Sequence, residues 1–194
     1  MAGRKHLEEM SMLDDRACKD LVVEHCRRVN ARDVTGLLRL YSPGVRFEDP
    51  VGSGIRRGHA ELRQHAMGAI HCGVHEYAHD PVGALNGKQA AVPVTAHLDF
   101  RTTAPLLSSQ GFMDWDGKPA GPGKRLQIHY VMVIEVDGSG LIAVMRAYWG
   151  RTDVTVVDER DVLTMPARPT TRSTAGGPTS GPSEPCRERP APRV

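Results

Sequence analysis

Asp49 and Glu76 are the residues of this chain whose types and positions best suit proton transfer. Asp49 ends the run 45–49, in which strand alternation places it on the same face as Val45 and Phe47. A carboxylate is costly to bury unless it is paired, hydrogen-bonded or protonated. Asp49 is therefore either a structural hydrogen-bond hub or a working acid or base. Asp-Pro followed by Gly is also ordinary turn chemistry, which leaves the structural role open.

Glu76 is the second candidate. Alternation in 74–80 places Glu76 on one face with Val74 and Ala78, and the histidines on the other. The opposite register would expose Glu76, and the pattern alone does not choose. If both carboxyl groups face one apolar cavity, burial would raise the pKa of one while hydrogen bonds keep the other ionised. That difference would divide them into an acid and a base.

Other chemistries find less support in the sequence. His71, His75 and His79 recur at intervals of four, but the glycine at position 73 and the alternation favour a strand over a metal-binding helix face. No Gly-x-Ser-x-Gly motif occurs, and the glycine-rich pieces lack a following helix of the phosphate-binding type. We expect neither a metal nor a cofactor.

The composition of the chain indicates which kinds of partner and which cellular compartment to expect. Only 5% of the residues are aromatic and the net charge is +2, which argues against nucleic acid as a partner. The four cysteines show no CxxC spacing, which is typical of reduced thiols. Acidic residues stand near the N-terminus where a signal peptide would be apolar, and no window reaches 18 apolar residues. We expect a soluble, cytoplasmic protein with no membrane partner.

The chain divides into three parts by composition. Half of the fourteen prolines fall in residues 165–194, where large apolar residues are almost absent. That segment has too little hydrophobic area to offset the entropy of ordering, so we expect a disordered tail. Residues 1–13 are expected to be flexible, and 14–160 to form one domain.

Within that domain the hydrophobic period changes from helical to alternating. Helices are expected at the ranges 14–30, 34–41 and 58–70. A strand around Asp49 and the alternating runs 74–82, 89–102, 126–136 and 141–152 should form a curved antiparallel sheet, with a hairpin turn at 137–140. This order predicts an α+β fold whose helices close a cup, where a small apolar ligand would bind.

Three segments resemble the ketosteroid-isomerase and SnoaL-like branch of the NTF2-like cone fold: 29–37, 47–53 and 144–150. The resemblance covers roughly residues 16–157 and implies that Asp49 is a general base. Steroid isomerisation also requires two oxyanion donors. Alignment on these segments places His25 and Met132 at the donor positions, so the resemblance does not extend to isomerase chemistry.

The chain is more similar to the epoxide hydrolases and cyclases of polyether biosynthesis, of the monensin and lasalocid type. That group pairs the same aspartate with a glutamate at the distance of Glu76. The resemblance implies a hydrophobic polyketide epoxide as substrate, Asp49 as base for the attacking hydroxyl and Glu76 as acid to the epoxide oxygen. It also implies a homodimer.

The apolar wall of the cup would then bind the substrate, with Phe112 and Trp115 as a lid. The candidate substrate-binding residues are His25, Tyr41, Phe112, Trp115, Tyr130, Met132, Met145 and Trp149. Two other classes stay open. A non-catalytic binding protein of the same fold would leave Glu76 exposed, and a lyase or hydratase would use Asp49 with His25 or His97.

Overall fold

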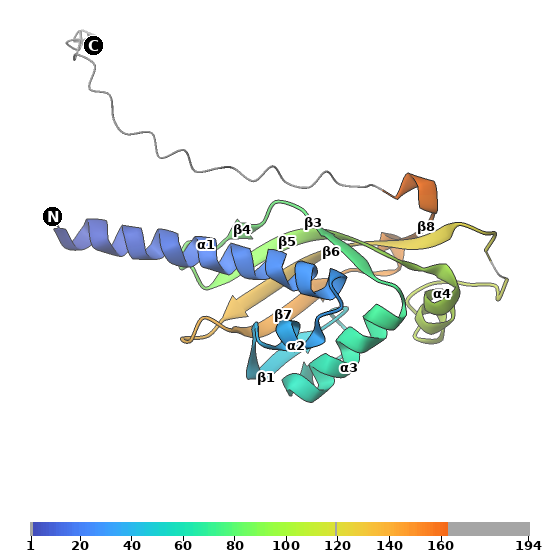
Figure 1. The fold of residues 1–194 in the computed structure, drawn as a ribbon, viewed down its shortest axis with the longest axis horizontal. Helices are drawn as coiled ribbons and strands as arrows, with labels where there is room; N and C mark the ends of the chain where they lie inside the picture. Colours follow the sequence, from blue (N-terminus) through green and yellow to red (C-terminus); the bar gives the residue numbers. More distant parts are fainter. Residues whose placement is uncertain (1, 119, 163–194) are drawn as a thin grey trace, which may run out of the picture. The chain divides into compact units, whose positions relative to one another are not determined.

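The computed structural model describes residues 2–118 and 120–162, with side chains described from residue 16 onward. The helices are α1 (Ala2–Asn30), α2 (Val34–Leu38), α3 (Gly58–His71), α4 (Phe100–Ser109) and the 3-10 turns η1 (Arg151–Asp153) and η2 (Glu159–Asp161). The strands are β1 (Tyr41–Glu48), β2 (Arg56–Arg57), β3 (His75–Ala78), β4 (Val82–Gly83), β5 (Gln89–Asp99), β6 (Lys124–Val136), β7 (Ile142–Tyr148) and β8 (Val154–Asp158) (Figure 1).

The strands form one mixed sheet in the order β2-β1-β7-β6-β5-β3, with β4 paired to β5 and β8 paired to β6. The neighbours are antiparallel except β1 and β7, which run parallel. The expected α+β cone is confirmed, but the sheet is not antiparallel throughout. The parallel pair brings the carboxyl ends of β1 and β7 to the same edge of the sheet.

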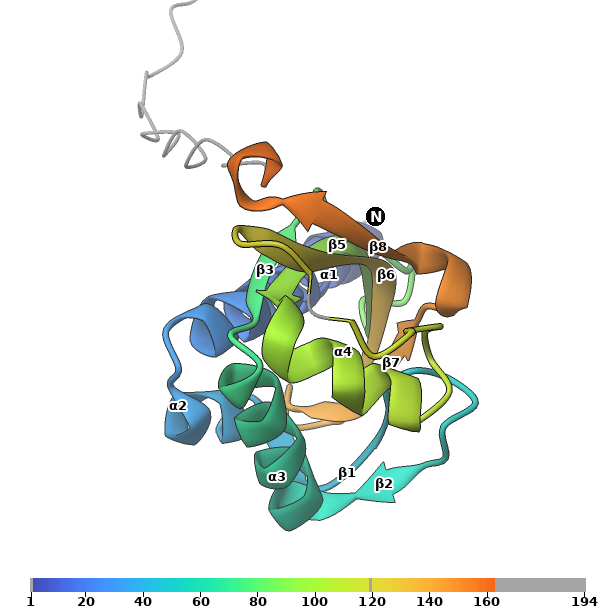
Figure 2. The same ribbon diagram turned by 90° about the vertical axis from the view of Figure 1, so that its right-hand side faces the viewer.

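The helices pack against this sheet and leave a space between them. α1 packs against β3, β4 and β5, while α3 packs against β1 (Figure 1). Asp33 caps α2 as expected, because its carboxylate accepts a hydrogen bond from the Gly36 amide at 2.8 Å. Figure 2 shows α4 beside α3 across one end of the sheet.

Several predicted boundaries were wrong. The first helix begins at Ala2 instead of near residue 14, and α2 ends at Leu38, so that Tyr41 opens β1. The run 89–102 is interrupted because the Asp99 carboxylate accepts hydrogen bonds from the amides of Arg101 and Thr102 and thereby starts α4. Neither α4 nor β8 was expected. The predicted tail, 165–194, lies outside the described residues.

The hairpin between β6 and β7 forms at the predicted turn. The Asp137 carboxylate accepts hydrogen bonds from the amides of Ser139, at 2.9 Å, and Leu141, at 3.2 Å. This arrangement is an Asx-type turn, in which a side chain takes the place of a backbone partner.

Within the described ranges, no helix is both long and apolar enough to cross a membrane.

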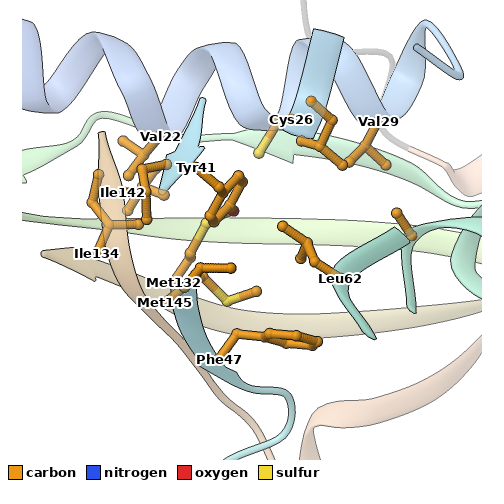
Figure 3. Packing of buried hydrophobic residues seen from close by; sticks show 14 of the residues in the cluster. Val22, Cys26, Val29, Tyr41, Phe47, Leu62, Met132, Ile134, Ile142 and Met145 are labelled. Atoms are coloured by element: carbon orange, nitrogen blue, oxygen red, sulfur yellow. The ribbon is translucent and has the colours of Figure 1, made fainter. Parts of the chain in front are cut away.

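A buried cluster between α1 and the sheet holds these elements together. Tyr41 and Phe47 of β1 meet Met132 of β6 and Met145 of β7 in its centre (Figure 3). Val45 and Phe47 are 0% and 1% exposed, which confirms the predicted phase of β1. Because side chains alternate along a strand, this phase also turns Asp49, just past the strand end, towards the interior.

Candidate active site

A cavity of about 970 Å³ lies between the helices and the concave side of the sheet. Its volume lies within the range typical of sites for small organic molecules. One face of α3 contributes Leu62, His65, Ala66 and Ala69, which follow the helical spacing i, i+3, i+4 and i+7. Asp49 and Glu76 both line the cavity, so the two predicted carboxyl groups share one space.

Two nitrogen donors hold the Asp49 carboxyl in place. Trp149 donates its indole N–H to Oδ1 at 2.7 Å, and Nε2 of His65 lies 3.0 Å from Oδ2. Trp149 reaches Asp49 because each residue directly follows one strand of the parallel pair β1 and β7. His65 comes from α3, which packs on β1. The Asp49 side chain remains 24% exposed, so it is accessible from the cavity.

Asp49 is held in its ionised form. Burial alone would raise the pKa of its carboxyl, but hydrogen bonds from His65 and Trp149 and the positive charge of Arg56 outweigh burial. The resulting pKa lies below the ordinary value for aspartate. Arg56 also donates to the Asp49 backbone carbonyl at 3.1 Å while it lies over the Phe47 ring. Asp49 is therefore a carboxylate that can accept a proton at neutral pH.

Glu76 is positioned through its backbone. It lies in β3, the strand that ends the sheet order, where Asn30 at the end of α1 takes the place of a further strand. The Asn30 side chain accepts a hydrogen bond from the Glu76 amide and donates one to the Glu76 carbonyl, both at 2.7 Å. The pairing of β3 with β5 sets the register that the sequence left open, and the two Asn30 contacts hold Glu76 in it.

The Glu76 carboxyl is held in an apolar setting and is 10% exposed. Burial raises its pKa to about 7, assisted by the negative charge of Asp49 and partly offset by the hydroxyl of Tyr130 and the thiol of Cys26. Tyr130 donates to Oε1 at 3.0 Å, whereas Oε2 has no hydrogen-bond partner among the described residues. A protonated Glu76 would be a proton donor for a ligand in the cavity, which this residue lines.

His25 lies beside Glu76 as a neutral imidazole. Burial lowers its pKa to about 4, with a further contribution from the nearby His65. Nδ1 of His25 lies 2.6 Å from the hydroxyl of Tyr41, and Nε2 lies 3.9 Å from Oε2 of Glu76. The last separation is too long for a hydrogen bond but leaves His25 within reach of any group bound to Glu76.

Most of the predicted wall residues line the cavity, and two do not. His25, Phe112, Tyr130, Met132, Met145 and Trp149 belong to its lining. Tyr41 is buried behind His25 instead. Trp115 lies outside the lining, and its indole N–H donates to the Lys118 carbonyl at 2.8 Å, so this half of the expected lid is not at the cavity wall. Phe112 packs edge-on against Trp149 at 5.4 Å.

His71, His75, His79 and His97 do not line the cavity. His97 pairs with His75 across β5 and β3, on the face opposite Glu76, and Tyr77 packs on its ring. His97 therefore does not meet Asp49, whereas His25, the other histidine of the lyase alternative, lines the cavity. His71 lies on α3, apart from the two other histidines of its series. Among the side chains that the structure describes, those of residues 16–118 and 120–162, no cluster of three or more metal-ligating groups occurs.

Sequence reasoning missed three residues that hold the carboxyl groups: Asn30, Arg56 and His65. His65 could have been found, because it shares a helical face with Leu62 and Ala66 in the predicted helix 58–70. Asn30 and Arg56 carried no such signal, since their partners are backbone groups distant in sequence.

The arrangement joins an ionised carboxylate and a carboxyl group with a raised pKa in one largely apolar cavity. Such a pair can remove a proton from one group of a bound molecule and deliver a proton to another. His65 and Trp149 tune the first group, whereas burial tunes the second.

Known proteins share this fold and part of the sequence. Residues 22–145 match the SnoaL-like domain model. Over 146 residues, which are 75% of this chain, 49% are identical to the epoxide hydrolase LasB of Streptomyces lasalocidi, and the match covers 51% of LasB. This chain thus aligns with about half the length of that relative.

Two solved structures are also similar. SalBIII, described as an epoxide hydrolase/cyclase-like enzyme in pyran ring formation in the polyether salinomycin, is 26% identical with a TM-score of 0.60. That match covers 74% of this chain and 98% of SalBIII. The Mycobacterium tuberculosis protein RV0760c, solved with estradiol-17beta-hemisuccinate, shares the fold at 19% identity and a TM-score of 0.55, over 72% of this chain and 98% of that protein. By the match to more than half of its length, this chain belongs to the SnoaL-like domain family.

Proposed function

We propose that this protein opens an epoxide of a polyketide chain with an internal hydroxyl group and so forms a cyclic ether. The observation that carries the proposal is the presence in one cavity of two carboxyl groups whose pKa values are shifted in opposite directions. The names of LasB and SalBIII, which refer to epoxide hydrolase and cyclase activity, support the same reaction class.

In this reaction Asp49 is the general base and Glu76 the general acid. Asp49 accepts the proton of the attacking hydroxyl while that oxygen forms a bond to one epoxide carbon. The bond between this carbon and the epoxide oxygen breaks, and Glu76 delivers its proton to the leaving oxygen. The product is a ring ether bearing a hydroxyl group. Both protons are accounted for, and Asp49 and Glu76 have exchanged protonation states.

The apolar wall supports ring closure over attack by water. Met132, Met145 and Phe112 line the cavity and offer a neutral chain an apolar surface against which to fold. A folded chain brings its hydroxyl close to the epoxide carbon, which lowers the entropic part of the barrier. The same surface excludes water from the reacting carbon. A hydrophobic polyketide epoxide is therefore the proposed substrate, and a homodimer remains the expected assembly.

Turnover of a synthetic hydroxy-epoxide tests the proposal. Cyclic ether formation should be followed by mass spectrometry and NMR for the parent protein, Asp49→Asn, Glu76→Gln and the control Glu135→Gln, whose exposed side chain lies on β6. Each amide in the cavity should lower the rate about 10²- to 10⁴-fold, because it keeps the shape but removes proton transfer. Glu135→Gln should be neutral. Parent-like rates in either cavity variant would refute the acid–base pair.

Hydrolysis to a diol is a second candidate, favoured by the contact between His65 and Asp49. An imidazole paired with a carboxylate can activate a water molecule in place of a substrate hydroxyl. The two reactions differ in the origin of one oxygen atom. Reaction in ¹⁸O-labelled water would leave the cyclic ether unlabelled, whereas a diol would gain one label.

A further inference from the structure

Thr103 places a buried hydroxyl group in the wall of the cavity. This residue lies on α4, is 1% exposed and belongs to the cavity lining. Its Oγ1 has no hydrogen-bond partner within the described part of the chain. Neither Asp49 nor Glu76 is bonded to Thr103. The mechanism proposed above leaves this hydroxyl without a task.

An unpaired threonine hydroxyl in a helix needs an explanation, because it can usually bond to the carbonyl three or four residues earlier. The neighbouring Thr102 makes such a bond, with Oγ1 donating to the Asp99 carbonyl at 3.4 Å. Thr103 does not, although its burial makes an unsatisfied hydroxyl unfavourable. Oγ1 itself has almost no accessible surface, so a ligand oxygen would satisfy it once rotation about χ1 of Thr103 turns the hydroxyl towards the cavity.

The surroundings of Thr103 are apolar and belong to α4 and the sheet. Leu107 of α4 and Ile128 of β6 belong to one buried hydrophobic cluster and line the same cavity as Thr103. α4 crosses one end of the sheet (Figure 2), whereas Asp49 follows β1 and Glu76 lies in β3. A single hydroxyl in such a wall would discriminate between a ligand that carries an oxygen there and one that does not.

We propose that Thr103 is a specificity-determining residue that hydrogen-bonds to an oxygen substituent of the substrate, remote from the reacting epoxide. This inference rests on the proposed function. A polyketide chain carries oxygen atoms at intervals along an otherwise apolar backbone, so an apolar wall alone would let it slide. One fixed hydrogen bond sets the register of the chain and thereby which carbon lies between Asp49 and Glu76. Thr103 then controls the size of the ring.

The test compares two hydroxy-epoxides, one with a remote hydroxyl group and one without it. They are assayed with the parent protein, Thr103→Val, Thr103→Ser and the control Thr102→Val, whose hydroxyl is exposed on the same helix. Valine keeps the branched shape of threonine and removes only the hydroxyl. We expect Thr103→Val to lower kcat/KM about three- to tenfold for the hydroxylated substrate alone and to raise the fraction of the other ring size. Thr103→Ser and Thr102→Val should resemble the parent.

The outcomes separate this inference from the proposed reaction. Equal effects of Thr103→Val on both substrates, or no effect on either, would overturn the specificity role. Affinities for the unreactive cyclic ethers, with and without the remote hydroxyl, are measured by calorimetry and need no turnover. A parent protein that converts neither epoxide but prefers the hydroxylated ether, and loses this preference in Thr103→Val, would refute the reaction and retain the binding role. Equal affinities in the parent would overturn that role.

Discussion

Replacing Glu76 by glutamine should make the protein more stable at alkaline pH while it lowers the rate of turnover. Glutamine resembles the protonated carboxyl in shape and can still accept the hydrogen bond from Tyr130. It also leaves the backbone contacts with Asn30 in place. The substitution therefore removes only the ability to ionise.

The magnitude follows from the raised pKa of Glu76. Its value is about 7 in the folded protein against 4.5 for an ordinary glutamate, and a tenfold change in proton affinity corresponds to about 1.4 kcal/mol. The folded state thus binds this proton more tightly than the unfolded state between pH 4.5 and 7. Its contribution to stability is complete below pH 4.5 and is lost as the pH rises through 7. At pH 8.5 the loss is about 3 kcal/mol.

Urea denaturation at pH 5.0 and pH 8.5 measures this effect directly. The free energy of unfolding of Glu76→Gln should exceed that of the parent by about 2–3 kcal/mol more at pH 8.5 than at pH 5.0. Other titrating groups, Asp49 included, contribute to both proteins and largely cancel in this comparison. The control Glu135→Gln removes an exposed carboxyl and should show no such difference. An advantage of Glu76→Gln that is the same at both pH values would refute a raised pKa at Glu76.

Three further variants probe the groups around the carboxyl pair. Trp149→Phe removes one donor to Asp49, so the pKa of Asp49 should rise and the acid limb of the pH–rate profile should move to higher pH; an unchanged limb would contradict this role. Asn30→Ala removes two hydrogen bonds to the Glu76 backbone, so urea denaturation should show a free energy of unfolding about 1–3 kcal/mol lower, and kcat should fall. An unchanged kcat would show that Asn30 does not position Glu76. A chain ending at Thr164 should retain parent kcat, since the candidate site ends at Trp149; lost activity with an intact circular dichroism spectrum would assign a role to 165–194.

The sequence predicted the residues whose own strand pattern determines their direction. Val45 and Phe47 set the phase of β1, and this phase places Asp49 inward. The Asp137 turn and the Asp33 cap were readable for the same reason, because the interactions are local. The resemblance to a known family supplied the pairing with Glu76, which local pattern left undecided.

The parts that the sequence did not predict depend on contacts between distant segments. The register of β3 follows from its pairing with β5, and Asn30, 46 positions before Glu76, bonds to the free side of the strand. α4 was hidden in an alternating run because Asp99 ends the strand and begins the helix at once. Trp115 was expected at the cavity as a large aromatic residue, but its indole bonds to a nearby carbonyl instead. The hydrophobicity of a residue alone does not show whether it lines the cavity or lies in a loop.

The parallel pairing of β1 with β7 also bears on how the protein folds. Asp49 and Trp149 are 100 positions apart, so their contact closes a long loop, whereas β6 and β7 are joined by a tight turn. Long loops cost more chain entropy to close, and pairings that close them form late as a rule. We expect β5, β6 and β7 to assemble first, with Tyr130 in place, and β1 to dock afterwards. Tyr130, the hydrogen-bond donor to Glu76, would then be in place before Asp49 contacts the indole of Trp149.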